Sequence, residues 1–244
     1  MTRSLSEIRR GRGFSLIELS IVLVVFALLA GGLLPLAARA RPPPGGVAAA
    51  PVAAGQRQHR EELRAAQQLD LALEALHAYA VVHGQLPCPA APGLPASDPQ
   101  AGLASCASEY GILPWQTLGL PATDPWGSYL SYFADKKYTA APPVGAGAGF
   151  TLDTEASAEV LDAATGGRQA TQLPAVLISH GRNAHQAHRP GVGRNGGGSA
   201  DEIQNGKNSR SFVDRPPAPD YDDLVRWINP AVLKLRLVNA GKLP

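Results

Sequence analysis

Histidine, serine and acidic side chains that could do chemistry gather between residues 179 and 202. His180, His185 and His188 are potential zinc ligands, but they stand in a glycine-rich stretch rather than on one helical face, with no acidic residue at a fixed spacing. Ser179 and His180 could act as nucleophile and base only if their side chains met, and adjacent side chains of a strand point to opposite faces. The chain has no Gly-x-Ser-x-Gly elbow, phosphate loop or dinucleotide fingerprint. The sequence therefore disfavours catalysis.

Cys88 and Cys106 are the only two cysteines, and the segment between them is rich in proline. A metal pair would need more ligands nearby, and a nucleophilic cysteine would need a preferred histidine, which the sequence does not indicate. In an oxidising compartment such a pair is expected to form a disulfide. Closing a loop of this size stabilises the folded chain by roughly 3 kcal/mol in the chain-entropy model.

The composition limits the possible classes of protein. The chain has 244 residues, enough for one or two modest domains, and a formal net charge of +2, which argues against a nucleic-acid-binding protein. Glycine (26) and proline (22) together indicate much loop and turn.

The apolar residues of the chain are concentrated near the N-terminus, in a stretch long enough to anchor the rest in a membrane. Residues 14–38 form a run of 25 residues that is apolar apart from Ser15, Glu18 and Ser20, and about 20 such residues span a bilayer as a helix. Four arginines precede the run, which predicts a cytoplasmic N-terminus and a head across the membrane. A secretory signal peptide cut after Ala40 is the alternative, but the run exceeds an ordinary signal-peptide core.

Glu18 is the exception in this apolar run. A carboxylate at the bilayer centre costs about 2.5–3.5 kcal/mol on insertion scales, and less near an end of the span, where Glu18 lies. It either reaches the interface or pairs with a cation buried beside it.

The segment Arg12–Leu19 (RGFSLIEL) and the apolar stretch after it resemble the N-terminal signature of type IV pilins and type II secretion pseudopilins. The signature has a glycine before the cleavage point, an aromatic residue after it and a glutamate at the fifth mature position, matched here by Gly13, Phe14 and Glu18. Pro35 resembles the proline that kinks the helix in many members. Proline bends a helix because it lacks the backbone N–H donor. The resemblance implies that a prepilin peptidase cuts between Gly13 and Phe14 and that Phe14 is methylated on its new amine.

This processing would create a positively charged group that can pair with Glu18. Cleavage creates an α-amino group at Phe14, and the Glu18 carboxylate of a neighbouring subunit can neutralise it. A lone charge is strongly disfavoured in a low dielectric and a pair much less so, which makes the contact fix the register between subunits. A head-to-tail contact that does not close gives an open helical filament.

Four segments are predicted along the chain. They are a cytoplasmic leader (1–13), a transmembrane and filament-core helix (14–38), a linker rich in Pro, Ala and Gly (39–55) and a periplasmic pilin-like head (56–244). The linker departs from the pilin pattern, in which the first helix usually runs unbroken into the head.

The head is predicted to be α+β, with a helix packed on a small antiparallel sheet with long loops. The helix covers residues 56–83 and ends at Gly84, and its core-facing stripe is predicted to comprise Leu63, Ala66, Leu69, Leu73, Leu76 and Ala80. Strands are expected at 129–133, 150–152 and 174–179, with a turn at 124–127 before the first. A short final helix is expected to begin with Asn229 as its N-cap and Pro230 at N1, and to stop at Gly241.

The head also resembles, more weakly, the major pseudopilin of type II secretion. The resemblance covers about residues 60–205 and includes the landmarks Gly84–Pro87, Asp124–Gly127 and Ser179–Gly181. In that pseudopilin the stretch after the last strand binds calcium, which implies a site here at Asn183, Asp201 and Glu202. An ordinary polar loop is the alternative, since Asn183 stands where the family has an aspartate and calcium prefers several carboxylates.

The sequence thus predicts a structural subunit of a type II secretion pseudopilus or a type IV pilus rather than an enzyme. Its expected partners are a prepilin peptidase, other pilin or pseudopilin subunits, an inner-membrane assembly platform and the lipid bilayer. The expected location is the inner membrane and then a periplasmic or extracellular filament. The alternative is a membrane-anchored periplasmic binding protein or enzyme that does not polymerise.

Overall fold

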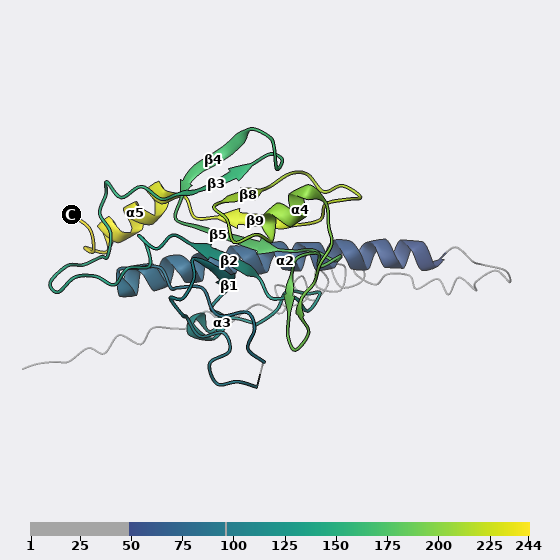
Figure 1. The fold of residues 1–244 in the computed structure, drawn as a ribbon, viewed down its shortest axis with the longest axis horizontal. Coiled ribbons are helices and arrows are strands. Elements are labelled where there is room, and N and C mark those ends of the chain that lie inside the picture. The colour runs from purple at the N-terminus through teal and green to yellow at the C-terminus, as the bar shows by residue number, and fades with distance from the viewer. Residues whose placement is uncertain (1–48, 96) are drawn as a thin grey trace, which may run out of the picture. The chain divides into compact units, whose positions relative to one another are not determined.

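Helix α2 (Ala49–His83) runs along one face of a four-stranded antiparallel sheet (Figure 1). The structure, a computed structural model, describes residues 49–95 and 97–244. The apolar side chains that α2 buries recur every three or four residues, as one helical face requires; they are Ala65, Leu69, Ala72, Leu76 and Ala80. The helix ends at His83, and Gly84 follows it with a left-handed φ of 71°.

The start of α2 differs from the prediction, whereas its end agrees. The helix is already present at Ala49, so residues 49–55 of the predicted linker are helical. The predicted leader, membrane helix and residues 39–48 lie outside the described residues. Leu63 was wrongly placed in the buried stripe and is 50% exposed. The reason is helical geometry, because six residues before Leu69 is a position about 120° around the helix.

The central sheet is buried on both faces. Its strands, in spatial order, are β1 (Tyr110–Ile112), β2 (Ser131–Ala134), β5 (Ala175–Ser179) and β9 (Leu224–Trp227). Tyr132 and Leu177 point toward α2, while Phe133 and Ile178 belong to the cluster on the opposite face. Burial on both sides explains why the segment at 174–179 is continuously apolar rather than alternating.

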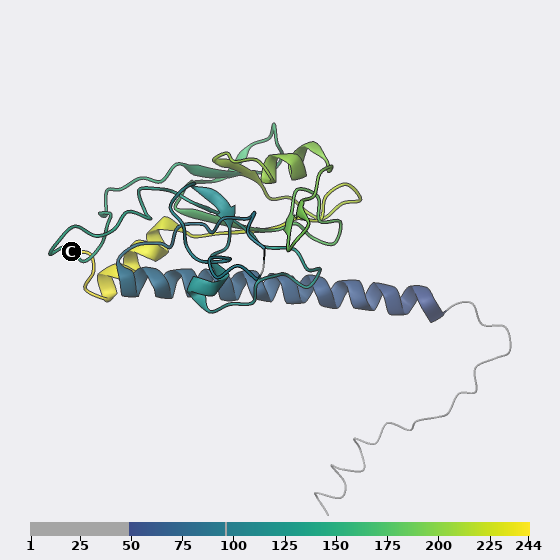
Figure 2. The same cartoon turned by 60° about the horizontal axis from the view of Figure 1, so that its bottom comes forward.

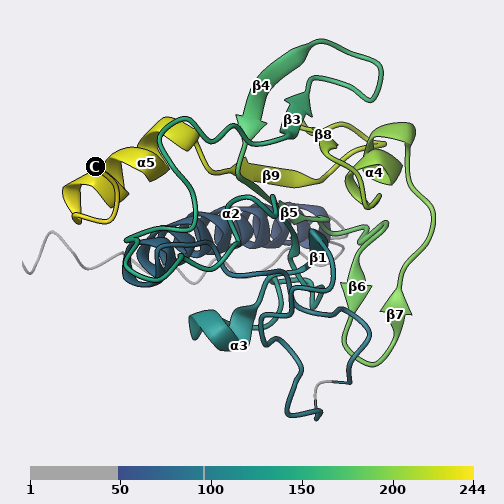
Figure 3. The ribbon, with the colours of Figure 1, turned by 60° about the vertical axis from the view of Figure 1, so that its left-hand side comes forward.

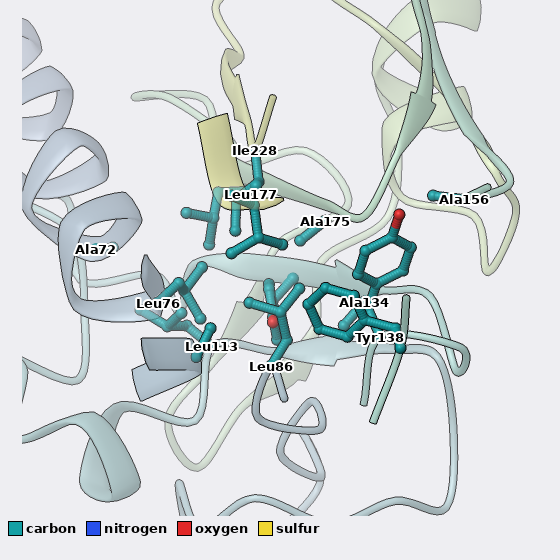
Figure 4. Close-up of a cluster of buried hydrophobic side chains, with 14 of the residues drawn as sticks. Ala72, Leu76, Leu86, Leu113, Ala134, Tyr138, Ala156, Ala175, Leu177 and Ile228 are labelled. Carbon is teal, nitrogen blue, oxygen red and sulfur yellow. The ribbon is translucent and has the colours of Figure 1, made fainter. Parts of the chain in front are cut away.

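The larger hydrophobic core lies between α2, the central sheet and helix α5 (Pro230–Asn239). Figure 4 shows Leu76 of α2, Leu177 of β5 and Ile228 converging in this core. In Figure 2, α5 lies alongside the C-terminal part of α2. The final helix begins as predicted, because the Asn229 side chain accepts hydrogen bonds from the backbone N–H groups of the first turn.

A second sheet covers the other face of the central sheet and was not anticipated. Its strands, in spatial order, are β4 (Arg168–Leu173), β3 (Ala158–Leu161) and β8 (Ser211–Val213). The β3–β8 pair is parallel, whereas β3–β4 is antiparallel. Val160 and Phe212 bury this sheet against Phe133 and Ile178. The head is therefore an α+β fold of three layers: helix, sheet and sheet.

The strand predicted at residues 150–152 is absent from the described structure. Phe150 is buried, with its ring 4.5 Å from that of Tyr138, but the backbone after it makes a turn closed by Thr151 and Thr154. Within the predicted strand, the Leu152 carbonyl accepts from the Lys234 ammonium at 2.6 Å. A side chain thus occupies a carbonyl that pairing with a neighbouring strand would need.

Short elements and one disulfide complete the head. These elements are α3 (Trp115–Leu118), β6 (His188–Arg189), β7 (Gly193–Arg194) and α4 (Ala200–Asn205). Figure 3 shows β6 and β7 as a hairpin extending from the edge of the head. Cys88 and Cys106 form a disulfide with Cα atoms 5.0 Å apart. Residues Ala50–Pro244 form one compact unit.

Candidate functional site

The residues predicted for processing and subunit register, Gly13, Phe14, Glu18 and Pro35, lie outside the described residues. The head, in contrast, gathers its buried polar side chains at one edge of the central sheet. Ser179, the last residue of β5, pairs with Leu224, the first of β9. The antiparallel pairing therefore brings the loop after β5 beside the segment before β9.

Ser179 and His180 point to different partners, as expected for neighbours at the end of a strand. The Ser179 hydroxyl donates to Asp124 Oδ2 at 2.8 Å, whereas His180 Nε2 lies 2.9 Å from Ser131 Oγ. Burial raises the pKa of Asp124, although hydrogen bonds from Ser128, Ser179 and Trp126 oppose the rise. The two side chains do not form a nucleophile–base pair with each other.

His180 contacts a different serine, Ser131, and an aspartate, Asp223, in the arrangement serine–histidine–aspartate of a catalytic triad. Ser131 Oγ contacts His180 Nε2, and His180 Nδ1 lies 3.5 Å from Asp223 Oδ1. The exposed fractions are 0% for Ser131, 0% for His180 and 2% for Asp223. A substrate would have to reach the serine through packed protein, so this geometry favours a buried polar network over a hydrolase site.

Three carboxylates lie together beside this network. Glu202, Asp222 and Asp223 each place an oxygen within 4.8 Å of the other two. Glu202 is the third residue of α4, where it closes a capping box with Ser199, and the two aspartates directly precede β9. We call these three residues the acidic cluster.

Each member of the acidic cluster has some hydrogen bonds. Glu202 accepts from the Asn183 amide at 2.7 Å and from the Ser199 backbone N–H at 2.9 Å. Asp222 Oδ2 accepts the backbone N–H groups of Arg182 and Asn183. Asp223 Oδ2 accepts from the Asn205 amide at 2.8 Å.

Three buried polar atoms around the cluster have no hydrogen-bond partner among the described residues: Asp222 Oδ1, Asp223 Oδ1 and His180 Nδ1. In that same part of the chain, no lysine or arginine forms an ion pair with Glu202, Asp222 or Asp223. Two of these atoms, Asp223 Oδ1 and His180 Nδ1, face each other at 3.5 Å. Because an unpaired buried polar atom is costly, Asp222 Oδ1 is the atom that points to a partner outside the described residues.

The carboxylates of the acidic cluster repel one another when they are charged. Burial raises the pKa of Asp222, and the neighbouring Asp223 and Glu202 carboxylates raise it further. Burial also acts to raise the pKa of Glu202, but hydrogen bonds from Asn183, Ser199 and His185 outweigh it and the pKa is lowered. The hydrogen bonds therefore favour the charged form of Glu202, and a cation would relieve the repulsion on Asp222.

The structure separates the residues that the sequence grouped as calcium ligands. Asn183 and Glu202 are in contact, but Asp201 lies elsewhere. Its Oδ1 accepts the Ala164 N–H at 2.7 Å, and its Oδ2 pairs with Arg215 Nε at 2.6 Å. Neighbouring helical positions point about 100° apart, which explains why Asp201 and Glu202 face different partners. The oxygen-rich donor set at Glu202 nevertheless suits a calcium ion.

The sequence did not indicate Asp222 and Asp223 as ligands, because the resemblance that implied the calcium site ends near residue 205. The adjacent acidic pair directly before a strand was the available signal. Among the described residues, the one group of three acidic, histidine or cysteine side chains close enough to hold a metal contains no histidine. His180, His185 and His188 thus do not make up the three-histidine zinc site considered from the sequence.

Comparison with known proteins identifies the N-terminal segment. A family model described as the prokaryotic N-terminal methylation motif matches residues 8–34, and this motif is the signature of type IV pilins and pseudopilins. The matched residues include Gly13, Phe14 and Glu18. No curated protein and no solved structure matches the chain. None of the helices in the described part, residues 49–95 and 97–244, has the length and apolar character of a membrane span.

Proposed function

We propose that this chain is a prepilin-like structural subunit that is cut between Gly13 and Phe14, methylated on Phe14 and assembled into a type II secretion pseudopilus or a type IV pilus. The observation that carries the proposal is the methylation motif over residues 8–34. A prepilin peptidase would act first, at the inner membrane, and an assembly platform would then extract the mature subunit.

The chemistry of assembly depends on one charge pair. The new α-amino group of Phe14 is positive, and methylation preserves that charge. Within a filament, Glu18 of one subunit neutralises Phe14 of its neighbour, while the apolar residues 14–38 pack in the filament core. An uncompensated charge in that environment would be strongly unfavourable, so the pair selects a single register.

The head would form the outer surface of such a filament. Its three layers are held by two hydrophobic clusters, one on each face of the central sheet, and by the Cys88–Cys106 disulfide. Helix α2 keeps one face in the core and presents the other, including the exposed Leu71 and Val82, to the outside. This arrangement supports a mechanical role better than a catalytic one, because the Ser131–His180 pair is closed to substrate.

A calcium ion would have a structural role in the head. Glu202 would bind it directly, and Asn183, which contacts Glu202, would help to place the loop after β5. When bound, calcium supplies positive charge that offsets buried carboxylates and ties neighbouring loops together. It takes no part in the processing of the leader.

The proposal is tested with the full chain expressed in cells that contain a prepilin peptidase and a filament assembly system. Replacement of Glu18 by alanine should leave cleavage and membrane anchoring intact and abolish incorporation into filaments. The matched control is Ser20→Ala, a polar residue of the same apolar run. Unchanged crosslinking of Glu18→Ala to other subunits would contradict the role proposed for Glu18. The absence of such crosslinks in the native chain would instead favour an anchored protein that does not polymerise.

A further inference from the structure

We propose that one side of the head docks on the anionic phospholipid headgroups of the membrane that anchors the chain. The docking surface consists of exposed arginines, which we call the arginine face: Arg57, Arg60, Arg64, Arg182, Arg189 and Arg194. The inference rests on the anchored stage of the proposed function, before extraction by an assembly platform, and it does not require that a filament forms.

The arginine face lacks the carboxylate partners that arginines elsewhere in the head have. Within residues 49–95 and 97–244, the arginines that form ion pairs with aspartate or glutamate are Arg168, Arg210, Arg215, Arg226 and Arg236. In the same ranges, the arginines of the arginine face form no such pair. An exposed guanidinium without a carboxylate keeps its fork of N–H donors available, and that fork matches the oxygens of a phosphate group.

Three members of the arginine face form a stripe on α2. Arg57, Arg60 and Arg64 are three and four residues apart, which places them on one side of the helix. Arg64 directly precedes the buried Ala65 and therefore points about 100° away from it. Residues 55–60 are all exposed, and Figures 1 and 2 both show the first turns of α2 extending beyond the rest of the head. The stripe is thus open to a broad surface such as a bilayer.

Hydrogen bonds bring two further arginines beside these turns of α2. Arg182, in the loop after β5, donates from Nη1 to Gln58 Oε1 at 3.1 Å. Arg189, in the β6–β7 hairpin, donates from Nη2 to the Trp126 carbonyl at 3.2 Å. The Trp126 indole in turn donates to Glu61 Oε2 at 3.2 Å. Segments that are far apart in the sequence therefore place their arginines on one surface.

Carboxylates near the arginine face offset only part of its charge. Glu61 and Glu62 are half-buried on α2, where they accept from the Trp126 indole and the Gln58 amide. Asp222 is also half-buried and lies beside the loop after β5. Six arginines against these three carboxylates leave an excess of positive charge, which an anionic lipid surface attracts.

The tip of the β6–β7 hairpin adds an apolar side chain. Val192 is 80% exposed, and it lies in the sequence between Arg189 and Arg194. The glycines on either side of it, Gly191 and Gly193, would have nothing within 4 Å of an added side-chain carbon. An exposed apolar residue flanked by cations suits the boundary between lipid headgroups and acyl chains, where both kinds of group are satisfied.

The length of the chain keeps the arginine face near the bilayer. The apolar run proposed as the anchor ends at residue 38, and α2 begins at Ala49. The residues between them span at most about 40 Å when fully extended, and Arg57 follows the start of α2 by about 12 Å of helix. This tether gives the arginines a high effective concentration of headgroups, so individually weak contacts are sufficient for docking.

The experiment measures the reactivity of each arginine toward phenylglyoxal in the full chain, inserted into lipid nanodiscs and read by peptide mass. One set of nanodiscs contains phosphatidylcholine alone, and the other contains about 30% phosphatidylglycerol, which supplies anionic headgroups. The arginine face should react at least about fivefold more slowly in the anionic set, the factor that one arginine contributes near such a surface. High salt should remove most of this protection, because it screens the attraction.

Arg168 provides the control within each sample, because its side chain is 69% exposed on the second sheet. It should react equally in both sets of nanodiscs. The variant with Arg57→Gln, Arg60→Gln and Arg64→Gln should reduce the protection of Arg189, and these exposed positions permit the change without loss of the fold. The matched control variant, Arg168→Gln with Arg210→Gln, should leave that protection unchanged.

Two results would overturn the proposal. Equal reactivity of the arginine face in neutral and anionic nanodiscs would show that it does not recognise lipid charge. Protection that appears only when other membrane proteins are added would assign the face to a protein partner instead.

Filament incorporation is measured separately, so that the two proposals can fail independently. Lipid-dependent protection of a native chain that does not enter filaments would retain the docking surface and reject assembly. Filament incorporation without such protection would reject the docking surface alone. Glu18→Ala should keep the protection of the arginine face, because Glu18 is not part of it.

Discussion

Arg236 of α5 donates two parallel hydrogen bonds to Glu74 of α2, from Nη1 to Oε2 at 2.7 Å and from Nη2 to Oε1 at 2.9 Å. The pair joins the C-terminal helix to the long helix across 162 residues of sequence. A bidentate geometry is the strongest form of this contact, but both side chains are partly exposed and solvent weakens it.

We predict a small effect for Glu74→Gln. The Arg236 hydrogen bond is the main reason that the pKa of Glu74 lies below its usual value of 4.5. Its stabilising contribution is therefore present above about pH 4.5 and is lost as the pH falls through the lowered value. The variant should reduce the free energy of unfolding at pH 7 by less than about 1 kcal/mol, because solvent screens an exposed ion pair. Denaturant unfolding at pH 7 and at pH 3 checks this, and an equal loss at both would contradict it.

Two leucines of α2 should respond very differently to truncation. Leu76 is fully buried in the larger core, whereas Leu71 on the same helix is 63% exposed. Leu76→Ala should cost about 2–5 kcal/mol of unfolding free energy because it leaves a cavity. Leu71→Ala should change stability by no more than about 0.5 kcal/mol. Denaturant melts of the two variants provide the comparison, and equal losses would show that the buried face of α2 is misassigned.

The pH dependence of stability should carry a contribution from His77. Burial is the main reason that its pKa lies below the usual 6.5, and Arg236 lowers it further, while Glu74 partly opposes this. The unfolded chain therefore binds a proton more readily than the folded chain. Stability is full above pH 6.5 and falls as the pH drops toward the lowered value.

His77→Leu should consequently flatten the decline in melting temperature between pH 7 and pH 5. His59→Gln is the control, because His59 lies on an exposed part of the same helix. If the slope of His77→Leu matched that of the native chain, another group would be responsible for the acid sensitivity.

Gly181→Ala should destabilise the edge of the central sheet. The residue has a positive φ, and a methyl group would meet Asp222. We expect a loss of about 1–3 kcal/mol, the typical cost of a strained backbone position. Gly191→Ala separates the two causes, since Gly191 also has a positive φ but an added carbon there contacts nothing within 4 Å. Urea melts of both variants test whether the Asp222 contact adds to the cost.

Local signals in the sequence accounted for several elements of the fold. The C-terminal end of α2 at Gly84, the strand β5 and the caps of α5 each depend on neighbouring residues, and all were predicted from them. The strands β3 and β8 were missed because they are short, and β4 was missed because it is largely exposed and polar. The β3–β8 pairing, which joins residues some 50 positions apart, is fixed by tertiary packing rather than by local preference.

The candidate cation site shows the same limit. Asn183 and Glu202 were expected from the resemblance to the major pseudopilin, and they do meet. Asp222 and Asp223 reach the same point only through the antiparallel pairing of β5 with β9. Asp201 was included because it stands where the resembled family has a later acidic ligand, but the rotation of the helix directs it to Arg215. Ligand sets assembled across a sheet edge cannot be read from local spacing.

The mass of the N-terminal peptide shows whether the chain is processed as a prepilin. The chain is extracted from membranes of cells that contain a prepilin peptidase and is then digested and analysed. We expect a mature chain that begins at Phe14 and carries a methyl group on its α-amine. A chain that still begins at Met1, or one cut after Ala40, would contradict it and would remove the cation that Glu18 needs.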